Sequence, residues 1–301
     1  MTTAPTGQKT MSLTKLFEEF IERPEISEFT RQKYFYRLRA FVAANGRLTA
    51  NEITTDMLLD YIGSQDLADA SKAIVRACFH AFLAFCGLDP NPAKDLPRWR
   101  ETPRRIVTPS DDHVKRALDE AVRMTNLGEA AAVRDGLIFA LSVVSGNRRG
   151  ELRNLPMSEL IMSLQAPDND VYRVYTQGKT GEAITRFTQF HVPLIHAYLD
   201  VRPFTDCPFV FVNDKGQHLS LVGFDRARPK VCKRAGVPTI TYQALRRRVA
   251  TIIANNQGVD VAAHALNHSP HSGDRVIRAY YYDPDMSRAD KATALAFEGM
   301  T

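Results

Sequence analysis

The sequence contains few cysteines, the residues whose disulfides stabilise small domains, with four among 301 residues, and it contains one tryptophan. Cys78, Cys86, Cys207 and Cys232 lie far apart, and none forms the paired CxxC spacing that binds zinc or makes a redox couple. We interpret them as reduced side chains that pack in the interior. The chain is long enough for two domains, each folding through an apolar core.

Long apolar runs are also missing. No stretch approaches the ~20 apolar residues that a membrane-spanning helix needs, and the first residues lack the pattern of a secretion signal. The sequence therefore predicts a soluble, cytoplasmic protein without a membrane partner. It contains neither a GxxxxGK[ST] loop for nucleotide phosphates nor the clustered acidic residues that two-metal nucleases need, so we expect no cofactor and no metal.

Charge is the first positive indication. Lysine and arginine exceed aspartate and glutamate by 39 to 34, which gives a formal net charge of +5 and a pI near 9.0. This excess suits a polyanionic partner such as DNA, although it is also common in proteins that bind no nucleic acid. The distribution of the charge must therefore decide between the two.

Residues 12–87 read as consecutive helices. The second helix follows Ser27 and carries Tyr34, Leu38 and Phe41 on one face, with basic residues on its other sides. A third begins near Thr55, and Cys86-Gly87 ends a fourth. The basic residues of the second helix that we single out as DNA-binding candidates are Arg31, Lys33 and Arg37.

The helical pattern stops between residues 89 and 107, where prolines alternate with basic residues. This composition is typical of an extended linker between domains. A basic strap suits a protein that encircles a polyanion, and a solvated charge run is the alternative. The DNA-binding candidates here are Arg98, Arg100, Arg104 and Arg105.

A larger, mostly helical region follows. Ser110 predicts a helix N-cap, and a long apolar helix is expected from about Ala130 to Val144. Two β-prone runs, Tyr172 to Gln177 and Ile184 to Val192, flank Gly178-Lys179-Thr180-Gly181, which predicts a hairpin with a tight turn. The fold class is therefore mainly α (α+β), with one small antiparallel sheet.

Four short segments of this region could carry chemistry. Ser145-Gly146-Asn147-Arg148-Arg149-Gly150-Glu151-Leu152 follows the apolar helix. The guanidinium of Arg148 can hold two phosphate oxygens, and the alternative is a basic helix start in which Arg148 or Arg149 pairs with Glu151. The others, in chain order, are the Gly178-Lys179 turn, Gln243-Ala244-Leu245-Arg246, and Leu266-Asn267-His268-Ser269 followed by Val276-Ile277-Arg278-Ala279-Tyr280-Tyr281-Tyr282. Each alone has an ordinary structural explanation, and their order is the informative feature.

In that order the segments resemble the tyrosine recombinases of the phage-integrase family. The likeness runs across most of residues 106 to 282, and the helical N-terminal segment resembles the family's core-binding domain. It implies the following organisation: a flexible tail over 1–10, a helical core-DNA-binding domain over 11–88, a basic linker over 89–107, a catalytic domain over 108–282, and a tail over 283–301 that is exchanged between protomers or caps its own domain.

The resemblance also implies roles for individual residues. Tyr280 is the nucleophile, with Tyr281 and Tyr282 as second and third alternatives; Lys179 is the general acid. Arg148, Arg246 and His268 contact the phosphate, Glu151 supports Arg148, and Arg186 is a further phosphate-contact candidate. Gln243 stands where the family usually has histidine, and a glutamine can donate a hydrogen bond but transfers no proton near neutral pH. Asn267 stands where the family has glycine.

The family cuts and rejoins DNA through a 3′-phosphotyrosine without metal or ATP, as four protomers on two DNA sites. We therefore expect double-stranded DNA with specific core sites as the partner, a homotetramer on DNA, and an additional directionality or accessory factor as a further partner to test. The expected location is the cytoplasm, at the nucleoid when bound. The substitution at Gln243 leaves an alternative open, in which the chain is a catalytically impaired member that binds DNA as an accessory protein. A type IB topoisomerase would use the same chemistry.

Overall fold

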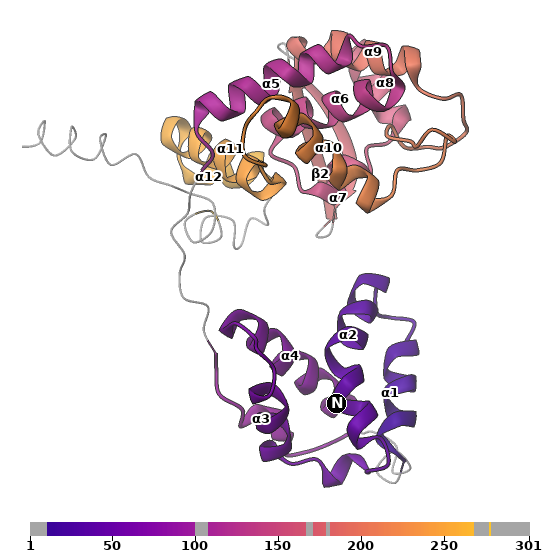
Figure 1. Ribbon diagram of the computed structural model, residues 1–301, viewed down its shortest axis with the longest axis vertical. Helices are drawn as coiled ribbons and strands as arrows, with labels where there is room; N and C mark the ends of the chain where they lie inside the picture. The colour runs from indigo at the N-terminus through magenta and orange to yellow at the C-terminus, as the bar shows by residue number, and fades with distance from the viewer. Residues whose placement is uncertain (1–10, 100–107, 167–170, 179–180, 268–276, 278–301) are drawn as a thin grey trace, which may run out of the picture. The chain divides into compact units, whose positions relative to one another are not determined.

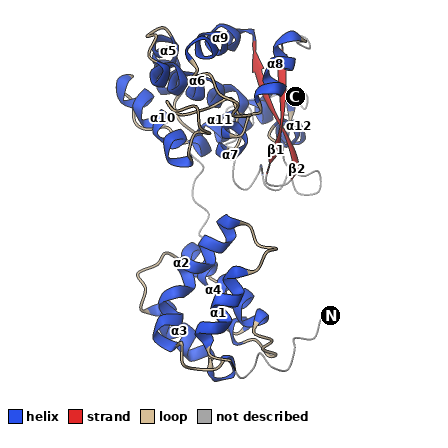
Figure 2. Cartoon of the chain, turned by 90° about the vertical axis from the view of Figure 1, so that its right-hand side faces the viewer, coloured by secondary structure: helices blue, strands red, loops and turns tan. Residues whose placement is uncertain are grey.

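The computed structural model describes residues 11–99, 108–166, 171–178, 181–267 and 277. It divides into two compact units, Met1–Arg104 and Arg105–Thr301, which are shown in Figure 1. Both units are mainly helical, and the described sheet has two antiparallel strands, β1 and β2, drawn in red in Figure 2. The predicted fold class is confirmed.

In residues 11–99 the first unit has four α-helices, and side-chain caps mark the starts of three of them. The Ser27 hydroxyl accepts a hydrogen bond from the amide of Thr30, and Thr54 does the same for Met57, so the second and third helices begin where the sequence predicts. The elements are α1 (Leu13–Glu22), α2 (Glu28–Asn45), η2 (Ala50–Glu52), α3 (Thr55–Gly63), α4 (Asp69–Phe85) and η3 (Pro92–Lys94).

Aromatic rings fill the core of this unit. Phe20, Phe41, Phe79 and Phe82 are fully buried and contact one another or neighbouring rings edge-on or tilted. Leu96, beyond the last helix, is only 2% exposed and belongs to the same core. The segment predicted as the start of a linker at residue 89 therefore packs on this unit.

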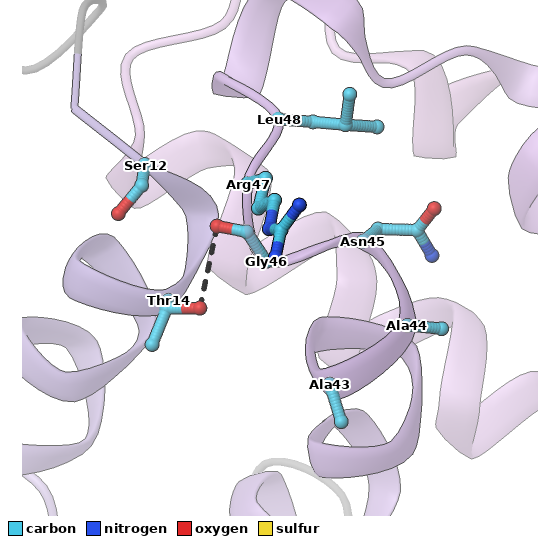
Figure 3. Close-up of a pocket in the computed structure, with 8 residues that line it drawn as sticks. All are labelled: Ser12, Thr14, Ala43, Ala44, Asn45, Gly46, Arg47 and Leu48. Carbon is cyan, nitrogen blue, oxygen red and sulfur yellow. Dashed lines mark hydrogen bonds between the residues drawn. The ribbon is translucent and has the colours of Figure 1, made fainter.

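The start of α1 and the end of α2 lie in close contact. Thr14 of α1 lies against Gly46 at the end of α2, and its hydroxyl donates to the Gly46 carbonyl, as the dashed line in Figure 3 shows. A Cβ built on Gly46 would lie 2.2 Å from Thr14 Oγ1, so only glycine fits at this crossing.

The second unit packs its helices around α6, which is buried along most of its length, as its apolar sequence predicts. The predicted cap is also present, because the Ser110 hydroxyl accepts from the His113 amide. The elements are α5 (Asp111–Thr125), α6 (Ala130–Ser145), α7 (Arg149–Arg153), α8 (Met157–Gln165), β1 (Val171–Gly178), β2 (Gly181–Thr188), η4 (Gln189–His191), α9 (Val192–Val201), α10 (Leu221–Arg234), α11 (Tyr242–Gln257) and α12 (Val259–Ala265).

The hairpin forms where the sequence predicts it, since Gly178 pairs with Gly181 and Val171 with Thr188. The predicted second strand, Ile184 to Val192, is wrong at both ends, because β2 runs from Gly181 to Thr188. Pro193 is the physical reason at the far end. Proline has no N–H for a strand ladder but fits the first turn of a helix, so α9 begins at Val192 after a turn of 3₁₀-helix.

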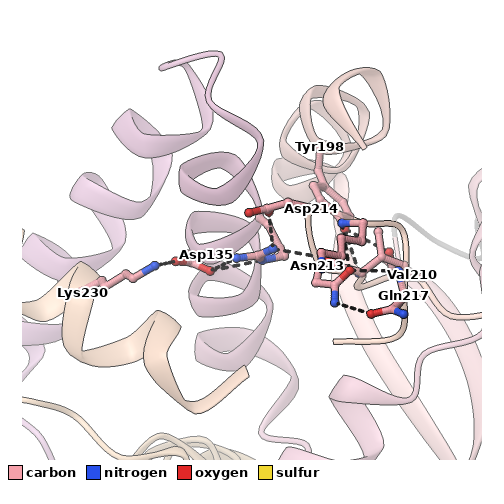
Figure 4. A network of polar contacts seen from close by, with 10 residues as sticks. Asp135, Tyr198, Val210, Asn213, Asp214, Gln217 and Lys230 are labelled. Carbon is pink, nitrogen blue, oxygen red and sulfur yellow. Dashed lines mark hydrogen bonds and ion pairs between the residues drawn. The ribbon is translucent and has the colours of Figure 1, made fainter. Parts of the chain in front are cut away.

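A buried ion network fixes α6 to its neighbours (Figure 4). Asp135, 1% exposed, contacts Arg134 and accepts from Lys230 Nζ of α10 at 2.7 Å. Arg134 in turn donates to the Val212 carbonyl at 3.1 Å. A buried carboxylate is tolerated only when its charge is compensated, and these two cations compensate it.

Cysteines contribute to both cores as single thiols. Cys78, Cys86 and Cys232 are buried and free, and burial raises the pKa of Cys86 to about 12.

Within the described ranges, no helix is long and apolar enough to cross a membrane.

His191 anchors the end of β2 to α6. Its ring is 4% exposed, Nε2 lies 3.3 Å from the Ala140 carbonyl oxygen, and the Thr188 amide donates to Nδ1 at 3.4 Å. This is the pattern of a neutral imidazole protonated on Nε2. Burial lowers the pKa of His191 below its ordinary value, despite the opposing effect of the two hydrogen bonds.

We predict that His191 makes the stability of this unit sensitive to acid. Because its pKa is lower in the folded state, the unfolded state binds the proton more tightly, and stability falls as pH drops below about 6.5. His191→Gln should flatten this slope in urea unfolding measured from about pH 7 to about pH 5. His196→Gln, on the exposed side of α9, is the matched control and should keep the wild-type slope. Equal slopes for both variants would contradict the assignment.

Candidate active site

The predicted site residues of the second unit that the structure describes lie on or beside three elements. Arg148 precedes α7, which carries Glu151; Gln243 and Arg246 lie on α11, and Arg186 lies on β2. Gly178, which begins the glycine-lysine motif, ends β1. The following predicted residues lie outside the described ranges: Lys179, His268, Tyr280, Tyr281, Tyr282, Arg100, Arg104 and Arg105. Figure 2 shows α12 beside the hairpin, and Asn267, which follows α12, bonds Ile184 of β2, so the segment before His268 and the hairpin with the glycine-lysine motif are neighbours.

Arg148 is held by Glu151 in two ways. One carboxylate oxygen, Oε1, accepts from Arg148 Nη1 at 2.6 Å, and the other, Oε2, accepts from the Arg148 backbone amide at 2.9 Å. Glu151 is 3% exposed, whereas the Arg148 side chain keeps 33% of its surface exposed. The ion pair that the sequence suggested therefore exists, and it orients the guanidinium without covering it.

The hairpin approaches this ion pair. A Cβ built on Gly178 would lie 3.3 Å from Glu151 Oε1 and 3.1 Å from the Gly181 carbonyl oxygen. The end of β1 that carries the Gly178-Lys179 motif is thus adjacent to the Arg148 segment. Glycine at this position allows the close approach.

Arg246 links two turns that are distant in sequence. Its Nη1 donates to the carbonyl of Gly146 and its Nη2 to the carbonyl of Leu266, both at 2.6 Å. Gly146 lies two residues before Arg148, and Leu266 lies two residues before His268. The side chain is 2% exposed, so the contacts are made in a buried environment where hydrogen bonds to a charged donor are strong.

The remaining positions of α11 and α7 differ in exposure. Gln243 is exposed near the start of α11, where a helix-start glutamine can present its amide to a partner. Arg248 donates twice to Asp111 Oδ1, at 2.9 and 2.7 Å, and so ties α11 to α5. Arg149, which the sequence left as an alternative partner for Glu151, instead pairs with Asp225 at 2.6 Å.

Two asparagines of this region were missed as site residues. Asn147 Nδ2 donates to Thr185 Oγ1 at 2.8 Å, and Asn267 bonds the backbone of Ile184 on the same strand. The signal was available for Asn267, because an asparagine in place of the family's glycine tolerates a left-handed backbone and adds an amide. For Asn147 the pattern allows any residue, so the sequence contained no signal.

Arg186 is half-buried and bonds a backbone carbonyl of its own unit. Its Nη1 donates to the Ala265 carbonyl at 3.1 Å, and burial, followed by the nearby charge of Arg173, lowers its pKa. Arg186 therefore joins β2 to the end of α12. Its predicted contact with a phosphate stays a prediction.

The DNA-binding candidates of the first unit differ in exposure and in their hydrogen bonds. Arg31 donates to the carbonyls of Ile21 and Arg23, at 2.6 and 3.3 Å, and so braces α1 against α2. Lys33 and Arg98 are exposed, and Arg37 is half-buried. Their DNA contacts stay predictions.

Across the described residues, no three His, Cys, Asp or Glu side chains form a group that could hold a metal.

We predict that Gly146→Ala destabilises the second unit more than an ordinary left-handed glycine would. Gly146 has a φ of 58°, and an added Cβ would lie 2.7 Å from Leu266 Cδ2 and 3.1 Å from Val249 Cβ. Backbone strain and overpacking together should cost about 3 kcal/mol of unfolding free energy. Gly128→Ala is the matched control, since Gly128 has a φ of 72° in open space and should lose only about 1 kcal/mol. Equal losses in urea unfolding would show that the contact with Leu266 is unimportant.

We also predict a structural cost at Arg246 that is measurable without DNA. Arg246→Ala removes both donors and should lower the unfolding free energy by about 3 kcal/mol, while Arg246→Lys, which keeps one ammonium, should lose less. Arg149→Ala removes a pair with side-chain exposures of 43% and 33% and should cost less than about 1 kcal/mol. The assignment fails if Arg246→Ala is as stable as Arg149→Ala.

Solved structures with the same fold support this arrangement of elements. XerH site-specific recombinase bound to difH substrate superposes with a TM-score of 0.68 at 17% identity, covering 93% of this chain and 83% of that one. The Tn1549 transposon integrase in complex with circular intermediate DNA gives 0.65 at 15%, covering 94% and 99%. A lambda integrase dimer bound to a COC′ core site gives 0.63 at 17%, covering 93% and 81%. At these identities the likeness concerns the fold.

The family assignment rests on sequence. No curated protein matches the chain. The model of the phage integrase family, however, matches residues 110–287, which is more than half of the chain and includes Arg148, Arg246 and the tyrosine segment. The chain therefore belongs to the phage integrase family.

Proposed function

We propose that the protein is a site-specific DNA recombinase of the integrase type, which cuts and rejoins strands through a 3′-phosphotyrosine. One observation carries the proposal: Arg246 hydrogen-bonds the two turns that lead to Arg148 and His268. Segments that lie more than a hundred positions apart in the family pattern are thereby joined, which supports the proposal. A helical scaffold with incidental basic residues would not require these particular segments to be joined.

The chemistry begins at Tyr280, whose hydroxyl gives its proton to water as its oxygen attacks a backbone phosphate of DNA. A bond forms between that oxygen and phosphorus, and the bond from phosphorus to the 5′ oxygen breaks. Lys179 gives its proton to the departing 5′ oxygen. The 5′ hydroxyl of a second strand then gives its proton to Lys179 and attacks the phosphotyrosine. The bond from phosphorus to the tyrosine oxygen breaks, and that oxygen takes a proton from water. Because the covalent intermediate conserves the phosphodiester energy, the cycle needs no ATP.

Positive charge around the phosphate supplies the catalysis in this proposal. Arg148 suits a non-bridging oxygen, because Glu151 orients its guanidinium and leaves a third of the side chain exposed. Arg246 and His268 contribute further donors, and the exposed amide of Gln243 adds a neutral one. Glu151 acts on Arg148 and does not touch the phosphate.

The partners follow from the same proposal. Double-stranded DNA with specific core sites is the substrate, and a tetramer is the assembly that exchanges strands between two sites. The lambda integrase tetramer bound to a Holliday junction, which shares this fold with a TM-score of 0.61, supports that assembly. The exposed Lys33 and Arg98 provide charge toward DNA phosphates.

The proposal predicts a covalent protein–DNA adduct on Tyr280. A duplex selected by the full chain from a randomised pool is nicked to make a suicide substrate, and adducts are resolved on a denaturing gel and mapped by peptide analysis. Tyr280→Phe should abolish the adduct, while Tyr281→Phe and Tyr282→Phe should retain it. Arg148→Ala should slow its formation about a hundredfold, because one charged donor to the phosphate is lost.

The exposed Arg149 provides the control, since Arg149→Ala should form the adduct at the wild-type rate. Specific binding of the selected duplex without any adduct would refute the proposed enzymatic activity. It would instead favour an accessory DNA-binding protein, the function for which the glutamine at position 243 is the motivating observation.

A further inference from the structure

Asn267 makes an unusual contact with the hairpin. Its Oδ1 accepts from the Ile184 amide and its Nδ2 donates to the Ile184 carbonyl, both at 3.1 Å. Of the non-glycine residues described, only Asn267 has a positive φ, at 55°. Glycine would adopt this backbone without strain, so the turn alone does not explain an asparagine.

The contact satisfies the free edge of β2. In an antiparallel pair, residues alternate between bonding to the partner strand and pointing their amide and carbonyl away from it. Ile184 lies opposite Tyr175 and presents both groups to Asn267. The carboxamide has one acceptor oxygen and an N–H donor, so it pairs with a strand edge as a further strand would.

Two neighbouring contacts act on the same stretch of β2. Thr185 accepts from Asn147, beside Arg148, and Arg186 donates to the Ala265 carbonyl at the end of α12. Three consecutive residues of the strand are thus joined to the segments before Arg148 and before His268. Among these three contacts, only that of Asn267 bonds both the backbone amide and the backbone carbonyl of a strand residue.

We propose that Asn267 is a positioning residue that fixes the hairpin carrying Lys179 against the turn that precedes His268. This inference rests on the proposed function, in which Lys179 protonates the leaving 5′ oxygen. Ile184 lies about 10 Å along the strand from Gly181, where the turn ends. Fixing the strand at Ile184 fixes the end of the hairpin at Gly178 and Gly181, between which Lys179 lies in sequence, and a proton donor must stay within hydrogen-bonding distance of the leaving oxygen.

Asn267→Gly is the decisive variant, because it keeps the left-handed backbone and removes only the two side-chain bonds. The matched control is Asn256→Ala on α11, which removes an exposed asparagine amide that bonds the Ile252 carbonyl within its own helix. In the protein without DNA, hydrogen exchange of residues 182–188 should accelerate about tenfold in Asn267→Gly and stay unchanged in the control. Unchanged exchange in both would overturn the proposal.

The catalytic consequence is tested with two forms of the nicked, selected duplex, one with the ordinary 5′ oxygen and one with sulfur in its place. A thiolate leaves without a proton, so cleavage of the sulfur form does not need the general acid. On the oxygen form, Asn267→Gly should cleave about tenfold more slowly than the wild type. On the sulfur form it should cleave at the wild-type rate, as should Lys179→Ala.

The outcomes separate the two proposals. Equal losses on both substrates would show that Asn267 acts through the fold or through His268, and no loss on oxygen would show that it positions nothing; either result overturns the inference. If the wild type forms no adduct with either substrate, the proposed function fails and Asn267 has no catalytic role, while hydrogen exchange still decides whether it holds the strand.

Discussion

The arrangement of the second unit depends on the guanidinium of Arg246. It is buried, and it bonds the carbonyls of Gly146 and Leu266, which belong to turns more than a hundred residues apart. A planar cation with several N–H groups can bridge two backbone oxygens where a lysine could reach only one at a time. The same residue type that suits a phosphate in the proposed function thus also joins two distant backbone segments.

The hairpin adds the second level of organisation. Strand β2 is held on one side by its ladder to β1 and on the other by contacts from Ile184, Thr185 and Arg186. At its far end His191 fixes the chain to α6 through the Ala140 carbonyl. A two-stranded sheet has little stability alone, so these contacts define where the hairpin lies.

The elements and the family could be predicted from sequence because both depend on local patterns. The helix start after Ser27, the cap at Ser110, the apolar run of α6 and the hairpin around Gly178 and Gly181 depend on residues close in sequence, and each prediction is confirmed. The strand end at Val192 was wrong because β-prone residues continue past Thr188, while Pro193 favours the first turn of a helix. The ion pair of Arg148 with Glu151 was correct because its partners lie one helical turn apart.

Long-range partners could not be predicted in this way. Arg149 is adjacent to Arg148 in sequence yet pairs with Asp225, and Arg31 and Arg186, proposed for DNA, bond backbone carbonyls of their own units. By itself, the sequence determined the helices, the hairpin turn and the ordered motifs of the family. Only the tertiary structure decided which carbonyls Arg246 joins and what Asn267 holds, because hydrogen bonds between distant segments depend on how the helices pack and leave no periodic trace in the chain.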